Sequence, residues 1–322
     1  MGQDDIVETD YVFFHDQEPI HMDLHKPLFD DVIQRNADMR PKSQGHVVVS
    51  ELGEFVEQLI DTYGWKPHYY FYHGWACQDW FRGYDKTFLI PRARDRAPTR
   101  TFMSPNRIVA GKRDHRVLFL YNVFKKKLDH NWISAPRVCS YENIDISVIA
   151  NKYCNTYSDI EQVFNSADLP KLFPGEETQQ MTSCWLTNFA ESADSLVYVP
   201  TETVYFGNRL HITEKTFKAI ALEMPFVLMA PAGSLEYMRR YGFKTFQGIF
   251  DESYDQEVDD IKRVEQVVQL LSDLDNLSVH EQQQIHRACL PIVEHNYNHF
   301  YNGGLTKVLW KELLGMLDGL RI

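Results

Sequence analysis

The amino-acid sequence predicts an α/β protein made of two lobes and a helical C-terminus. Short apolar runs alternate with helical patterns over roughly the first hundred residues, which is typical of parallel sheets built from strand–helix–strand units. A second series of this kind starts near residue 101, after a charged segment bracketed by prolines at 91–98. Beyond about residue 256 only amphipathic helical patterns occur. We therefore expect one lobe over residues 1–97 and a second, with the terminal helices, over 98–322.

The N-terminal lobe is expected to contain three strands and two helices. The strand candidates are the apolar or aromatic runs at 11–14, 47–49 and 68–72. Ser50 is placed to cap a helix that extends to about Tyr63, because a serine hydroxyl can accept from the first N–H groups of a helix. A second helix, rich in aromatic residues, is expected around 79–81. Segment 91–98 lacks apolar periodicity and is interpreted as the linker.

The C-terminal lobe is expected to repeat the alternation before it becomes helical. Its first candidate elements are a strand at 101–107, a helix at 115–127 and strands near Val138 and at 196–199. Later candidates are a short helix from Ser234 to Gly242, a return to the sheet at 243–246 and an acidic loop at 251–255. Three amphipathic helices are expected at about 256–274, 279–296 and 304–318.

The segment from Tyr205 to Ala230 gives the clearest local prediction. Thr213 is a candidate N-cap, Pro225 stops the helix that follows, and 226–229 has the continuous apolar character of a strand buried on both faces. The start of such a helix carries unpaired N–H groups and a partial positive charge, which can hold a diphosphate. The alternative is an ordinary helix–strand unit with surface charges.

Composition limits the classes of protein that remain. The 322 residues are 44% hydrophobic, enough for a substantial core, yet no run approaches the length of a membrane span. The first residues are acidic and lack the apolar region of a secretory signal, so a cytoplasmic location is expected. Five scattered cysteines without a C-x-x-C pair fit reduced thiols. The histidines lack ligand spacing, and no metal site is expected.

Charge is distributed unevenly along the chain. Residues 82–127 contain thirteen Lys or Arg against three Asp, which gives this stretch a net charge of +10. Because the whole chain has a net charge of −12, the remaining residues together carry −22. A local positive field of this kind attracts phosphate groups. The alternative is a basic surface that is merely solvated.

Two groups of polar residues lie at the ends of predicted strands in the N-terminal lobe. Asp16 and Glu18 follow the first strand, where a carboxylate can act as a general base for a hydroxyl, although an ordinary turn before Pro19 is also possible. His73, Trp75 and Trp80 follow the third strand and could form a wall against a sugar or a base. Core packing is the alternative for these three residues.

Two further groups in the C-terminal lobe are candidates for binding phosphate. The first comprises Asn106, Arg107 and Arg116, with Lys112, Arg113 and His115 in the same strand–loop–helix corner. The second comprises Asn208, Arg209, Thr213, Glu214 and Lys215. Guanidinium and ammonium groups at helix starts can hold a diphosphate and stabilise it as a leaving group. Together the two groups predict a two-sided phosphate clamp.

Several short motifs carry a resemblance to a known family. Residues 103–106 read Met-Ser-Pro-Asn at the end of a predicted strand, and Arg116 lies on the predicted helix that follows. This is similar to a family pattern in which a strand ends in Ser-x-Asn and the next helix bears Arg. The sequence 213–217 reads Thr-Glu-Lys-Thr-Phe, and 16–19 reads Asp-Gln-Glu-Pro. With parts of 225–255, these motifs resemble nucleotide-sugar glycosyltransferases with two Rossmann-like lobes (GT-B), in particular the fucosyltransferase-like group and its phage relatives.

The resemblance implies inverting, metal-independent transfer of a sugar from a UDP-, GDP- or CMP-sugar to a hydroxyl, with no prosthetic group. Lys215 and an arginine would hold the diphosphate, and Glu214 would contact the donor. Some phage enzymes of this kind modify hydroxymethylated bases, so the expected acceptor is a hydroxymethylated pyrimidine in phage DNA, in the host cell cytoplasm. The basic stretch would contact DNA phosphates, and the target base would be flipped out of the duplex. The residues expected to bind this acceptor are His73, Trp75, Trp80, Arg92, Arg94 and Arg96.

Other functions are compatible with the same residues. The same chemistry could act on a glycan, a lipid or a protein. A protein of this architecture could also bind nucleotide or DNA without turnover, or could be a phosphorylase that requires inorganic phosphate.

Overall fold

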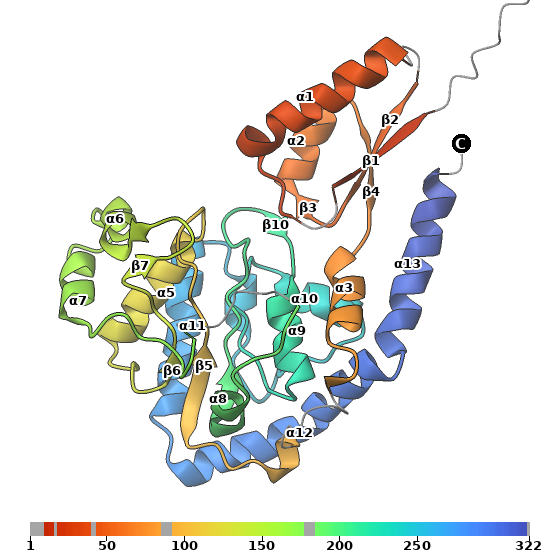
Figure 1. The fold of residues 1–322 in the computed structure, drawn as a ribbon. Coiled ribbons are helices and arrows are strands. Elements are labelled where there is room, and N and C mark those ends of the chain that lie inside the picture. The colour runs from red at the N-terminus through yellow and green to blue at the C-terminus, as the bar shows by residue number, and fades with distance from the viewer. Residues whose placement is uncertain (1–9, 16–17, 40–42, 85–91, 177–183, 321–322) are drawn as a thin grey trace, which may run out of the picture.

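The computed structural model describes residues 10–15, 18–39, 43–84, 92–176 and 184–320. It shows a mixed α/β chain with two small parallel sheets and a helical C-terminus (Figure 1). The buried apolar residues form two clusters. The smaller cluster lies within residues 10–70, and the larger begins at Phe71. We call these parts the N-terminal unit and the larger unit.

The N-terminal unit is a three-stranded parallel sheet with two helices. Its strands, in the spatial order β1-β2-β4, are β1 (Tyr11–His15), β2 (Gly45–Val49) and β4 (Lys66–Tyr69). Its helices are α1 (Met22–Met39) and α2 (Glu54–Tyr63). Phe29, Val47 and Trp65 are almost fully buried between the sheet and these helices. The three predicted strands are thus confirmed, although the third ends before Tyr70.

The expected cap of α2 is wrong. Ser50 does not cap the helix, because its hydroxyl accepts from the backbone N–H of Tyr72 at 3.2 Å. Between Ser50 and the helix the chain forms β3 (Leu52–Gly53), which pairs antiparallel with β10 (Arg209–Leu210) of the larger unit. Helix α2 therefore begins only at Glu54, after Gly53 with φ 117°.

The larger unit is built around a second parallel sheet. Its strands, in the order β6-β5-β9, are β6 (Trp132–Ile133), β5 (Arg100–Ser104) and β9 (Ser195–Tyr198). Beyond β9, the buried run 226–229 lies parallel to it through single bridges, Tyr198 to Phe226 and Thr201 to Met229, rather than as a regular strand. Val138 belongs to a small antiparallel hairpin of β7 (Val138–Cys139) and β8 (Ile144–Asp145).

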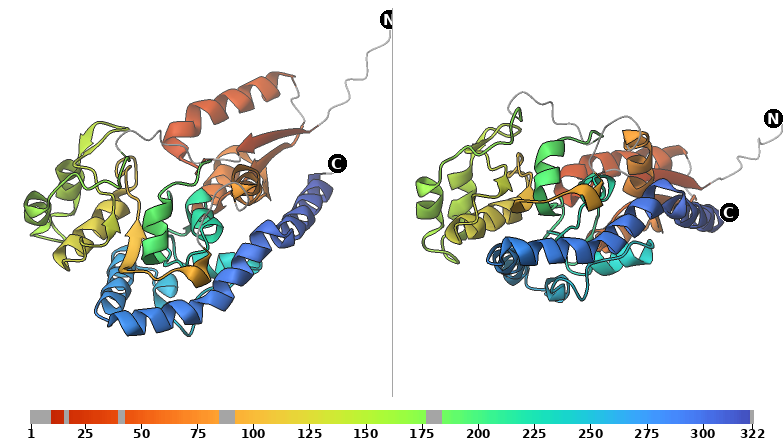
Figure 2. Two further views of the ribbon diagram at one scale, coloured as in Figure 1. Left: turned by 60° about the horizontal axis from the view of Figure 1, so that its bottom comes forward. Right: turned by 90° about the horizontal axis from the view of Figure 1, so that it is seen from below.

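Helices surround this sheet and close the chain. Those before residue 200 are α3 (Tyr72–Trp80), α5 (Asp114–Lys125), α6 (Ile146–Ala150), α7 (Ile160–Ser166) and α8 (Phe189–Asp194), with 3₁₀ turns at Ala93–Asp95 and Asn151–Tyr153. Those after it are α9 (Glu214–Ala221), α10 (Ser234–Arg240), α11 (Asp260–Asp275), α12 (Val279–Tyr301) and α13 (Gly304–Leu320), with a 3₁₀ turn at Ser253–Gln256. Helix α13 returns to contact α3 and β4 (Figures 1 and 2).

Two predicted features of this unit are corrected. Segment 243–246 is not a strand: the side-chain amide of Asn296 bonds both backbone groups of Lys244 at 2.8 Å, and the Glu252 carboxylate accepts from the N–H of Phe246. The part of the expected linker that the structure describes is attached to the larger unit. Arg92 lies 2.5 Å from the carboxylate of Glu223, which fixes this segment at the C-terminal end of α9.

A buried ion pair joins the two units. The guanidinium of Arg209, from β10, contacts both carboxylate oxygens of Glu51 at 2.5 and 2.7 Å and donates to the backbone oxygen of Ile20 at 3.0 Å. The Glu51 carboxylate also accepts from the N–H of Ile20 at 2.8 Å. The side chains of Glu51 and Arg209 are 1% and 8% exposed, so water cannot replace either partner. This pair fixes the start of α1 and the end of β2 against the larger unit.

We predict that Arg209→Met lowers the free energy of unfolding by about 3–5 kcal/mol, because it leaves the Glu51 carboxylate buried without its counter-charge. Urea denaturation followed by circular dichroism measures this change. Lys26→Met is the matched control, since the Lys26–Asp30 pair is exposed and such pairs contribute little. Equal midpoints for Arg209→Met and the wild type would show that the pair does not hold the units together.

Candidate functional site

A cavity of about 410 Å³ lies between the two units. The N-terminal unit contributes His21, Glu54 and Phe55 to its wall, and the larger unit contributes Gly111, Lys112, Asp114, Tyr153, residues 203–207 and Arg209. Almost every lining segment follows the carboxyl end of a parallel strand: His21 comes after β1, the α2 start after β2, 111–114 after β5 and 203–207 after β9. Open parallel sheets bind their ligands at this edge.

Two glycines give the lining loops left-handed backbone conformations. Gly111 has φ 65°, and a Cβ atom there would lie 2.2 Å from a carboxylate oxygen of Glu142. Gly207 has φ 81°, and a Cβ atom there would lie 2.5 Å from a carboxylate oxygen of Glu54 across the cavity wall. Lys112 also adopts a left-handed conformation, with φ 64°. A larger residue at either glycine would be strained, because residues other than glycine rarely adopt these φ values.

The cavity wall contains charges of both signs, the carboxylates of Glu54 and Asp114 and the cations Lys112 and Arg209. Lys112 is exposed and has no ion-pair partner among the described residues, unlike the Arg209 guanidinium beside it. Burial, followed by the charges of Lys112 and Arg209, lowers the pKa of His21 to about 4. Helices α2 and α5 both begin at this cavity without a side-chain cap. Their partial positive charges add to that of Lys112.

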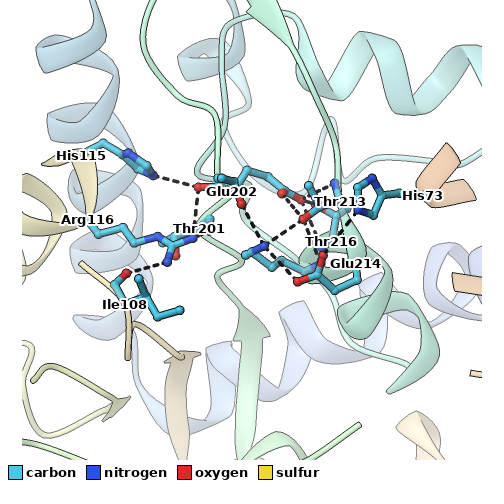
Figure 3. A network of polar contacts seen from close by, with 11 residues as sticks. His73, Ile108, His115, Arg116, Thr201, Glu202, Thr213, Glu214 and Thr216 are labelled. Carbon is cyan, nitrogen blue, oxygen red and sulfur yellow. Dashed lines mark hydrogen bonds and ion pairs between the residues drawn. The ribbon is translucent and has the colours of Figure 1, made fainter. Parts of the chain in front are cut away.

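The start of α9, where a diphosphate was expected, is already occupied. The fully buried carboxylate of Glu202 accepts from the hydroxyls of Thr213 and Thr216, both at 2.6 Å, and from their backbone N–H groups at 3.2 and 3.3 Å. Figure 3 shows Glu202 lying between these threonines and the side of the network that contains Arg116. Thr213 is the N-cap, as predicted, but these helix N–H groups bind a carboxylate of the protein itself.

Lys215 remains beside the cavity. Its ammonium donates to the hydroxyls of Thr203 and Thr213, both at 3.1 Å, and to the carboxylate of Glu214 at 3.0 Å. Thr203 lines the cavity, and the Lys215 side chain is 27% exposed. Burial alone would raise the pKa of Glu214, but the charges of Lys215, Lys218 and His73 lower it to about 2. The Glu214 carboxylate is therefore ionised and holds Lys215 in place.

The structure does not place the other predicted phosphate ligands in this cavity. The buried guanidinium of Arg116 donates to the backbone oxygens of Ile108 and Thr201, both at 2.7 Å, and burial lowers its pKa to about 9. Arg107 lies 3.6 Å from the carboxylate of Glu176. Asn106 is buried, and its side chain bonds Ser104 and Thr201. Arg116 and Asn106 thus fix the loops after β5 and β9 rather than line the cavity.

The predicted acceptor residues are distributed over three places. His73 is buried, 4.0 Å from the Glu214 carboxylate, and Trp80 packs against the larger core. Trp75 packs against Trp310 of α13, with ring centroids 5.0 Å apart. The arginines at 92, 94 and 96 lie at the other end of α9, where the Arg96 guanidinium donates to the backbone oxygens of Leu222 and Glu223. None of these six residues lines the cavity.

The structure does not place either described candidate, the predicted base Glu18 or the predicted donor residue Asn208, in the cavity wall. Asp16 lies outside the described residues. Glu18 is exposed and is not part of the cavity wall. Asn208 is exposed, and its backbone oxygen accepts from the N–H of Glu54 at 3.1 Å. Sequence reasoning missed His21, Tyr153 and residues 203–207, for which no short motif gives a signal.

Comparisons with protein families, with characterised proteins and with solved structures return no match for this chain. Within the described residues, no three His, Cys, Asp or Glu side chains gather in a way that could hold a metal ion. No helix in that part of the chain is long and apolar enough to cross a membrane. The site is therefore interpreted from its own geometry.

Two buried histidines in this region make stability depend on pH. Burial, with the neighbouring His73, lowers the pKa of His211 to about 3. Burial, with the Arg116 charge, lowers the pKa of His115 well below its usual range. The unfolded chain binds protons at these histidines below about pH 6.5, whereas the native chain does not until much lower pH. The contribution of these two histidines to stability therefore rises with pH across this window and is constant above it.

We predict that the free energy of unfolding increases from pH 5 to pH 7 and then reaches a plateau. His211→Asn should reduce that slope, because an amide can still donate to the Ser50 backbone oxygen, as the histidine does at 3.2 Å, but does not titrate. Urea titrations at each pH measure the slope. Glu214, whose pKa falls from 4.5 to about 2 on folding, contributes stability that is fully present above about pH 4.5 and so does not affect this range. A slope unchanged in His211→Asn would contradict the assignment.

Proposed function

We propose that this chain is a nucleotide-sugar-dependent glycosyltransferase whose donor binds in the cavity between the two units. The observation that carries the proposal is the position of Lys112 and Lys215. Both lie at the carboxyl edge of the second sheet, Lys112 in the cavity wall and Lys215 bonded to the cavity residue Thr203. A volume of about 410 Å³ is within the usual range of small-molecule sites.

The chemistry assigned to these residues is stabilisation of a leaving group. When a hydroxyl oxygen attacks the anomeric carbon of the donor, its proton passes to a general base or to solvent, the bond from that carbon to the diphosphate oxygen breaks, and the diphosphate leaves with the electron pair. Ammonium groups beside the diphosphate stabilise the charge that develops on it. Attack opposite to the leaving group inverts the anomeric carbon, and the charge is balanced by protein side chains.

Aromatic and acidic side chains of the same cavity fit the rest of a nucleotide. Phe55, Tyr153 and Phe206 provide flat faces of the kind on which a base stacks. The Arg209 guanidinium lies 4.1 Å from the centre of the Phe55 ring, which fixes that face against the ion pair between the units. Glu54 and Asp114 supply oxygen acceptors for hydroxyl or N–H groups.

We predict that a nucleoside diphosphate raises the melting temperature of the chain and that Lys112→Ala or Lys215→Ala weakens this binding about tenfold or more, because each removes an ammonium group from the diphosphate. A thermal-shift panel of UDP, GDP, CMP and their sugars tests this. Lys126→Ala is the matched control, since Lys126 is exposed and bonds Gln269 on α11. If no nucleotide of the panel stabilises the wild type, the proposed donor site is wrong.

The acceptor remains the one that the sequence suggests, a hydroxymethylated pyrimidine in DNA. The charge of the basic stretch supports this proposal, but many of its cations are engaged within the protein. Arg92 pairs with Glu223, and Lys125 lies 2.9 Å from a carboxylate oxygen of Asp159. Lys112 is the cation of this stretch that lines the cavity. A glycan, lipid or protein acceptor would use the same donor site.

We predict that single-stranded DNA containing hydroxymethylcytosine shifts in a native gel with this protein at low salt and is released as salt is raised. The same measurement on Lys112→Ala should show weaker binding, whereas Lys262→Ala, an exposed lysine on α11, should leave it unchanged. No shift at low salt, where contacts to DNA phosphates are strongest, would remove the DNA acceptor but leave the donor proposal intact.

A further inference from the structure

One edge of the N-terminal sheet has no neighbouring strand within the described residues. Strand β1 pairs with β2 on one side, and the order β1-β2-β4 leaves its other side as the edge. Backbone N–H and C=O groups on such a side are unpaired, and natural edges are usually protected by charged residues, prolines or bulges. Strand β1 reads Tyr-Val-Phe-Phe-His and contains no Lys, Arg, Asp, Glu or Pro. Helix α13 of the larger unit contacts this sheet at β4, the opposite edge (Figure 1).

Two apolar side chains of β1 are exposed beside this edge. Phe13 packs against Phe29 of α1, with ring centroids 6.0 Å apart, so Phe13 points to the face of the sheet that the helices cover. Because side chains alternate along a strand, Val12 and Phe14 point to the opposite face. They are 39% and 55% exposed. An exposed apolar surface therefore lies on this face, next to the unpaired backbone.

Helix α1 carries two exposed leucines above the same edge. Phe29 faces β1, and the carboxylate of the next residue, Asp30, accepts from the hydroxyl of Tyr63 on α2 at 3.0 Å. Successive helix residues are rotated by about 100°, so Leu28, just before Phe29, lies on the side of α1 away from α2. Leu24 lies one turn earlier on that side, and the two leucines are 48% and 71% exposed. Helix α2 contacts β4, so the side away from it is the side of the free edge.

The free edge is therefore apolar in two layers, and we call β1 with Leu24 and Leu28 the edge surface. A single extended peptide could pair with β1 and cover Val12 and Phe14, but it would leave the leucines of the helix layer in water. A partner that covers both layers needs a strand with a helix packed over it and apolar side chains on each. A second copy of this chain presents this combination at its own edge surface.

The charges around the edge surface also favour a second copy. On the leucine side of α1, the next residues are Asp31 and Arg35, which form an ion pair at 2.9 Å and have no net charge together. The whole chain has a net charge of −12, so two copies repel each other over most of their surface. At the edge surface this repulsion is small, and a strongly charged partner such as a nucleic acid would find no excess of opposite charge there.

We propose that two copies of this chain associate through the edge surface, with their β1 strands antiparallel about a two-fold axis and their α1 helices side by side. The two three-stranded sheets then become one sheet of six strands. An axis at Phe13, the middle residue of β1, places Val12 of one copy opposite Phe14 of the other on the same face. This inference goes beyond the proposed function and does not depend on it, since a chain without transferase activity would form the same dimer.

The first test measures the mass in solution by gel filtration with light scattering. We expect twice the chain mass of 37.8 kDa. Phe14→Lys and Leu28→Lys should each raise the dissociation constant of the dimer about tenfold or more, because each buries an ammonium group in an apolar contact. Leu314→Lys, at an exposed leucine of α13, is the matched control and should remain dimeric. A wild type that stays monomeric in the upper micromolar range, or a dimer lost in Leu314→Lys but kept in the other two variants, would overturn the proposal.

The second test uses cross-linking to examine the strand pairing itself. Directly opposite residues of an antiparallel pair have Cβ atoms about 4.5–5.5 Å apart, and diagonal neighbours are farther apart, so opposite residues are better placed for a disulfide. Chains with Val12→Cys and Phe14→Cys, mixed in reductant and then oxidised, should therefore form a covalent dimer faster than either variant alone. The wild type, which has an exposed Cys154, gives the rate of chance collisions. Equal rates for the mixture and for the separate variants would overturn the pairing of β1 with its copy.

Discussion

The cavity depends on the buried ion pair between Arg209 and Glu51. This pair, with the antiparallel contact of β3 and β10, fixes the N-terminal sheet so that the carboxyl ends of both sheets face each other. His21 and Phe55 are held opposite Lys112 by the same contact. Buried ion pairs contribute little net stability but are costly to break on one side.

A second polar network forms the wall on the side of the larger unit. Glu202 binds the start of α9, and Arg116 donates to the backbone oxygens of the loop that carries Glu202. Together they position Thr203, which accepts from Lys215. The residues that the sequence predicted to bind phosphate therefore differ in position: some are buried under the loops, and others lie at or beside the cavity. Arg116 donates to the backbone oxygens of these loops, whereas Lys112 lines the cavity and Lys215 bonds the cavity residue Thr203.

Much of the fold could be predicted from local sequence patterns. The strands at 11–14 and 47–49 and the terminal helices follow directly from apolar periodicity. The cap of α2 could not be predicted, because Ser50 is displaced by a strand whose partner lies more than 150 residues away. Segment 243–246 was mistaken for a strand because its burial depends on side chains of Asn296 and Glu252 that no local pattern reveals.

Prediction of the site was limited for the same reason. Residue type identified Lys215 and the corner that contains Lys112, but it could not show that Glu202 already satisfies the start of α9. Nor could it show that Arg92 and Arg96 pack at the opposite end of that helix. His21 carries no motif, and its place in the cavity wall follows only from the approach of the two units.

The most direct test of the account is a crystal structure of the chain with the nucleoside diphosphate that stabilises it most. The account predicts that the diphosphate lies in the cavity between the units, within reach of Lys112 and Lys215 and opposite His21. A nucleotide bound elsewhere on the chain, with this cavity containing only water, would contradict it.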